Sequence, residues 1–176
     1  MPLFYSFLLL LVTGSAIAQK KAPPTLKSIL LEQLKTTHNN EDWFVPINVA
    51  IQGLTVEQAS WKDSSTNHSI AQLVNHLIFW NTESLVKFKG GKPAAFSGDN
   101  KETFTGVDKT AWEASIHRID SLMIEWEKAV EAADDAKLQT WYSTIAHIGT
   151  HNAYHTGQII YIRKMRGNWD ADKGVK

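Results

Sequence analysis

Four long stretches of the chain carry apolar side chains at helical spacing, and polar segments separate them. The stretches span residues 26–37, 70–89, 109–133 and 143–165. Within each, apolar residues recur every three or four positions, which places them on one face of an α-helix. Ser69 and Asp108 directly precede two of the stretches and are typical helix N-caps. No segment alternates apolar and polar residues as a strand would, so the pattern predicts an all-α four-helix bundle.

Two other segments depart from this pattern. Residues 43–54 predict a second, shorter helical piece, in which Pro46 fits the first turn. Residues 90–107 contain four glycines, one proline and no helical period, so we expect a long surface connection there. A connection of this length in a compact domain is often functional, for instance as a lid over a site.

The apolar run at the start of the chain is of a different kind. Residues 3–12 are almost entirely apolar, and the small residues Ala16 and Ala18 follow before Gln19. This order predicts a cleavable signal peptide over residues 1–18, because so short a run cannot cross a bilayer core about 30 Å thick. An uncleaved anchor or a buried first helix is the alternative. Cleavage would place the mature protein in the periplasm or outside the cell.

Composition and charge narrow the function classes. The 176 residues include 18 basic and 18 acidic side chains, so the formal net charge is zero. A nucleic-acid partner or an anionic membrane favours a basic protein, which this balance argues against. The chain has no cysteine, which excludes disulfides, thiolate metal sites and iron–sulfur clusters. Any metal site must therefore use nitrogen and oxygen ligands, and the seven histidines are the first candidates.

Two of these histidines have the spacing of a metal-binding pair. His151 and His155 are four residues apart in a predicted helix, so both imidazoles lie on one face and reach a single ion. Zinc proteases use the same spacing with a glutamate after the first histidine. Here that position is Asn152, so the general base of those enzymes is missing and their mechanism is excluded.

A third ligand has to come from another helix of the bundle. His76 is the best candidate, because it lies in the middle of a predicted helix among apolar positions. A core histidine hydrogen-bonded to a neighbour is the alternative. His147 is one turn before His151 and fits the rim of a site or a supporting role. We expect His38 and His68 to be solvated in loops and His117 to lie at a helix edge.

Several short motifs of the chain resemble one known family. Residues 151–159 read HNAYHTGQI and are similar to the HxxxHxGQI signature of the DinB-like (YfiT-like) superfamily of metal-dependent hydrolases. Upstream, GLTVEQA at 53–59, SIA at 69–71 and NHLIFW at 75–80 resemble that family in the same order. The resemblance covers residues 25–167. It implies a four-helix bundle with one divalent metal held by three histidines, at the matching positions His76, His151 and His155.

Such a site has an open, catalytic character. Three neutral imidazoles leave the ion its full charge and free positions, so that it acidifies bound water or polarises a substrate. An all-nitrogen ligand set suits zinc or nickel first, and also copper or iron. Gln158 is a candidate to orient a substrate or support a histidine, with a helix-packing hydrogen bond as the alternative. Glu83 is a weaker candidate for a general base, and Trp80 for a pocket wall.

The sequence thus predicts an exported metal-dependent hydrolase or transferase acting on a small molecule. The alternative is a metal-binding bundle without catalysis, serving a stress or interaction role. Haem binding is disfavoured, since a chain without cysteine has no attachment motif. Thiol-dependent transferases of the family work in the cytosol, and export argues against their substrates. We expect no nucleic-acid partner and no membrane contact after cleavage, and a homodimer fits the family resemblance.

Overall fold

Helices account for the regular structure of the protein. The computed structural model describes residues 23–63 and 67–174, and no strand occurs within them. The helices are α1 (Leu26–His38), α2 (Ile47–Ile51), α3 (Val56–Ser60), α4 (Ile70–Phe88), η1 (Asn100–Thr103), α5 (Lys109–Ala132), α6 (Asp135–Met165) and η2 (Ala171–Lys173). The predicted all-α class is confirmed. The predicted signal peptide over residues 1–18 lies outside the described residues, and no described helix is long and apolar enough to span a membrane.

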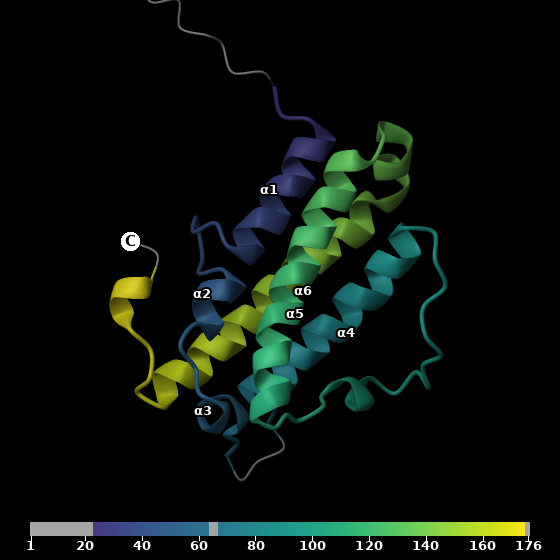
Figure 1. Ribbon diagram of the computed structural model, residues 1–176. Helices are drawn as coiled ribbons and strands as arrows, with labels where there is room; N and C mark the ends of the chain where they lie inside the picture. Colours follow the sequence, from purple (N-terminus) through teal and green to yellow (C-terminus); the bar gives the residue numbers. More distant parts are fainter. Residues whose placement is uncertain (1–22, 64–66, 175–176) are drawn as a thin grey trace, which may run out of the picture.

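The four long helices α1, α4, α5 and α6 pack side by side into a bundle (Figure 1). Helices α5 and α6 each contact both α1 and α4, so the four surround a common interior. The short helices lie at one end, α2 against α6 and α3 against α4. The segment that connects α4 to α5 returns along the outside of the bundle and carries η1, which contacts α4 (Figure 1).

Capping side chains set the helix starts. Ser69 and Asp108 accept hydrogen bonds from backbone N–H groups in the first turns of α4 and α5, as their positions predicted. The predicted start of the last helix was wrong, because α6 begins at Asp135, about two turns earlier. Asp134 caps this start and Leu138 is fully buried, so the early turns belong to the bundle.

The predicted helix over residues 43–54 is much shorter in the structure. Only Ile47–Ile51 is helical, with Pro46 as its N-cap. Shortly after its end, Gly53 has a φ of 74°, a left-handed conformation that glycine adopts without a steric penalty. The turn at Gly53 therefore separates α2 from α3.

A buried pair of asparagines fixes α4 against α6. Asn81 Nδ2 donates to Asn152 Oδ1 at 2.8 Å, and both side chains are fully buried. Along both helices the apolar core changes at this pair, from a cluster that includes Ile70 and Ile159 to one that includes Leu85 and Ile145. Because a buried amide pair is satisfied in one register only, it determines which residues of α4 and α6 face each other.

Candidate metal centre

Three histidine side chains converge between α4 and α6. His151 Nε2 lies 3.1 Å from His76 Nε2 and 3.0 Å from His155 Nε2. The ligand atoms of all three lie within 4.8 Å of one another, and among the described residues no other such group of three potential ligands occurs. Three nitrogen atoms directed at one point are the donor set that a single ion needs. The residues present therefore fit a divalent metal.

Burial keeps these imidazoles neutral. Burial, together with charge repulsion from neighbouring histidines, lowers the pKa of His76 to about 3 and that of His151 to about 4. Burial also lowers the pKa of His155. A metal ion binds the unprotonated nitrogen, so all three rings are in the ligating form at neutral pH.

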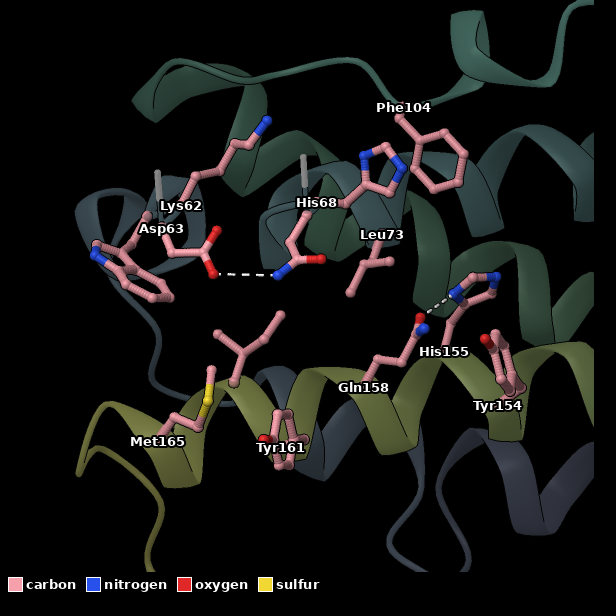
Figure 2. A pocket seen from close by; sticks show the side chains of 13 residues that line it. Lys62, Asp63, His68, Leu73, Phe104, Tyr154, His155, Gln158, Tyr161 and Met165 are labelled. Atoms are coloured by element: carbon pink, nitrogen blue, oxygen red, sulfur yellow. Dashed lines mark hydrogen bonds between the residues drawn. The ribbon is translucent and has the colours of Figure 1, made fainter. Parts of the chain in front are cut away.

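Hydrogen bonds to the outer ring nitrogens orient two of the three rings. His155 Nδ1 lies 2.7 Å from Gln158 Oε1, one turn along α6 (Figure 2). Since an amide oxygen only accepts, the proton of His155 is on Nδ1 and Nε2 faces the centre. His76 Nδ1 lies 2.5 Å from Thr103 Oγ1, at the end of η1. Such contacts to the non-ligating nitrogen are usual in metal-binding histidines.

Two cavities adjoin the three histidines. One of about 520 Å³ is lined by all three histidines together with Trp80, Ser84 and His147. The other, of about 480 Å³, contacts His155 and Gln158 and extends past Tyr161 towards Met165 (Figure 2). Phe104 and Tyr154 line both cavities. Only the first cavity therefore contacts all three histidines.

The other predicted residues have different surroundings. Trp80 lines the larger cavity, as predicted, and its Nε1 donates to Asn100 Oδ1 at 3.1 Å. His147 is exposed at the same cavity. Glu83 is half-buried on α4 and lines neither cavity.

The two histidines expected to be solvated in loops have different surroundings. His38 is fully buried at the end of α1, with Nδ1 2.6 Å from Glu127 Oε1 and Nε2 3.0 Å from Asp120 Oδ1. His68 lies before α4, as a loop residue should, but its ring stacks on Phe104 at 3.7 Å. The prediction of solvation was wrong for His38, because tertiary contacts that local sequence does not reveal cover its ring. His68 is half-buried and lines a cavity.

Two residues of the site carry no sequence signal. Thr103 and Phe104 belong to the long connection between α4 and α5, where no periodic pattern marks individual positions. Phe104 stacks on His76 with ring centroids 4.1 Å apart and planes 6° apart. The unusual length of the connection was the one indication that it has a role at a site.

Comparison with known proteins agrees with this geometry. The family model of the DinB superfamily matches residues 47–159, more than half of the chain and a region that includes all three histidines. The chain belongs to the DinB superfamily. This DinB-superfamily protein is also similar to a protein of Geobacillus thermodenitrificans (strain NG80-2) named "Putative metal-dependent hydrolase". The two are 24% identical over 139 residues, covering 69% of this chain and 78% of the other. No solved structure gives a significant match.

Proposed function

We propose that this DinB-superfamily protein binds one divalent metal ion through Nε2 of His76, His151 and His155 and hydrolyses or transfers a group on a small molecule. The convergence of three neutral imidazoles at a cavity of about 520 Å³ carries this proposal. When bound, such an ion supplies the charge that polarises a substrate carbonyl or phosphoryl group. Zinc and nickel are the metals that we expect first, because every donor is an imidazole nitrogen.

The residues around the larger cavity suggest how protons are exchanged. No carboxylate is among its described lining residues, and Glu83 is not part of it. Besides the three ligands, the titratable groups there are His147 and Tyr154. His147 is exposed on α6, one turn before His151, so both water and substrate can reach it. We therefore assign proton transfer to His147 in place of Glu83.

A catalytic role fits the surroundings better than a structural one. Structural zinc sites are closed, with four protein ligands. Here three potential ligands gather among the described residues, and a cavity contacts all of them. The metal-binding bundle without catalysis remains the competing function, and substrate turnover distinguishes the two.

Export and assembly complete the proposal. Residues 1–18 would be removed as a signal peptide, and the DinB-like bundle of residues 25–167 would act in the periplasm or outside the cell. The apolar run at residues 3–12 with small residues after it supports this. The partners would be a small-molecule substrate and a second copy of the chain. The formal net charge of zero argues against nucleic acid.

A substrate panel tests the proposed activity. The purified protein is stripped with a chelator, reloaded with zinc or nickel, and assayed on esters, amides, phosphoesters and a thiol with an electrophilic acceptor. Wild type is compared with His155→Ala and with His117→Ala, a control that removes an exposed histidine of α5. We expect metal-dependent turnover of one substrate class, lost in His155→Ala and retained in His117→Ala. Metal binding without turnover of any class above the His155→Ala level would favour the non-catalytic function.

A further inference from the structure

Side chains of α4 hold the connecting segment over the metal centre. Asn75 Nδ2 donates to the carbonyl of Thr105 at 2.9 Å, and Trp80 Nε1 donates to Asn100 Oδ1 at 3.1 Å. These two positions lie on either side of His76 along the helix. The segment of residues 99–105, which we call the η1 segment, is therefore fastened to α4 both before and after this ligand.

The hydroxyl of Thr103 determines where His76 carries its proton. Thr103 is 3% exposed, and its Oγ1 lies 2.7 Å from the carbonyl oxygen of Asn100 and 2.5 Å from His76 Nδ1. A hydroxyl has one hydrogen, and a carbonyl oxygen only accepts. Thr103 therefore donates to Asn100 and accepts from His76 Nδ1–H. The lone pair of His76 is thus on Nε2, the atom that faces His151 at 3.1 Å.

Phe104 stacks on the face of the His76 imidazole. Its ring lies between those of His76, at 4.1 Å, and His68, at 3.7 Å, with planes within 6° of parallel in both stacks. The η1 segment thus contacts His76 at the edge through Thr103 and at the face through Phe104. These two contacts fix both the tautomer and the plane of the imidazole.

We infer that Thr103 is a positioning residue for the metal centre, and that metal binding at His76 and ordering of the η1 segment are coupled. The inference rests on the proposed metal-binding function. A neutral imidazole can carry its proton on either nitrogen. Without the hydroxyl, the proton can move to Nε2 and occupy the lone pair that the metal needs. Loss of such a supporting hydrogen bond typically weakens metal binding about 10–100-fold, and coupling between two sites acts in both directions.

Three variants separate this role from general loop stability. Thr103→Val keeps the shape and removes the hydroxyl, whereas Thr103→Ser keeps the hydroxyl. Thr105→Val is the matched control, because its hydroxyl lies in the same segment but contacts Asn75 at 3.1 Å rather than a ligand. The zinc dissociation constant is measured by competition with a chelator. We expect it to rise about 10–100-fold in Thr103→Val and to stay near the wild-type value in Thr103→Ser and Thr105→Val.

Two spectroscopic measurements test the inference without depending on the fold of a variant. The ¹⁵N shifts of His76 in the metal-free wild type should show the proton on Nδ1. Zinc should slow amide exchange in residues 99–105 of the wild type.

The outcomes distinguish this inference from the proposed function. Wild-type protein that binds neither zinc nor nickel would overturn the proposed function and the inference with it. Zinc binding by Thr103→Val as tight as by wild type would overturn the inference alone. So would a proton on Nε2 of His76 in the metal-free wild type, or failure of Thr103→Ser to restore affinity.

Discussion

His38 joins α1 to α5 through two carboxylates, and its replacement tests how far this buried contact stabilises the bundle. Its side chain has no exposed surface, and its two ring nitrogens lie 2.6 Å from Glu127 and 3.0 Å from Asp120. Ionised carboxylates only accept hydrogen bonds, so a ring nitrogen of His38 that bears a hydrogen donates to the carboxylate it faces. The hydrogen bond from His38, aided by one from Asn48, lowers the pKa of Asp120 below its ordinary value.

The two contacts differ in strength because the two carboxylates differ in exposure. The Glu127 side chain is 19% exposed, and a hydrogen bond to a charged group there stabilises by about 1.5–3 kcal/mol. The Asp120 side chain is 43% exposed, so water screens its contact and reduces it to about 0.5–1 kcal/mol. His38→Leu, which removes both contacts, should therefore lower the free energy of unfolding by about 2–4 kcal/mol.

Urea unfolding at pH 7, followed by circular dichroism, measures this loss. The control is His117→Leu, an exposed histidine of α5 that we expect to change stability by less than about 0.5 kcal/mol. Because the pKa of Asp120 is lowered in the folded protein, its contribution is present above the ordinary value of 3.8 and is lost as pH falls through the folded pKa. The difference in the free energy of unfolding between wild type and His38→Leu should thus become smaller in strong acid. A loss below about 0.5 kcal/mol at pH 7 would refute the reasoning.

Three further predictions concern the metal centre and its support. Burial lowers the pKa of His76 to about 3, so the unfolded chain binds a proton below pH about 6.5 that the folded chain excludes. The free energy of unfolding of the metal-free protein should therefore fall as pH drops from about 6.5 to about 3, and it should fall less steeply in His76→Asn. Urea unfolding across this pH range measures both proteins, and an equal pH dependence of the two would contradict this. Asn81→Ala leaves the buried Asn152 amide without its partner and should reduce stability by about 1–3 kcal/mol, and the double variant with Asn152→Ala should lose less than the two single changes combined. Gln158→Leu removes the acceptor of His155 Nδ1 and should weaken zinc binding about tenfold, whereas Gln158→Glu keeps an acceptor and should not; equal affinities for both would show that the contact has no role.

The sequence predicted correctly those features that depend on residues within one helical turn of each other. The caps at Ser69 and Asp108 are read from neighbouring residues, because a cap bonds within one helical turn. The start of α6 was missed because Leu138 is the one buried residue among residues 135–142, and a single position gives no repeating apolar face. The pairing of His151 with His155 is likewise a local, one-turn relation.

Contacts between distant segments were much harder to predict. His76 was chosen as the third candidate ligand for its apolar neighbours and its family motif, and only the packing of α4 on α6 brings it to the pair. The burial of His38 depends on two carboxylates more than eighty positions away. Thr103 and Phe104 lie in a connection without periodicity, where only the fold reveals which residue contacts His76.

Metal stoichiometry and affinity show whether His76, His151 and His155 form a metal centre. Stripped wild-type protein and the His76→Ala/His155→Ala variant are titrated with zinc and with nickel in a calorimeter, and metal content after dialysis is measured by elemental analysis. We expect one ion per wild-type chain and loss of that binding in the variant, with the helical content of both unchanged. Equal binding by the two proteins would contradict the assignment of the three histidines as the metal centre.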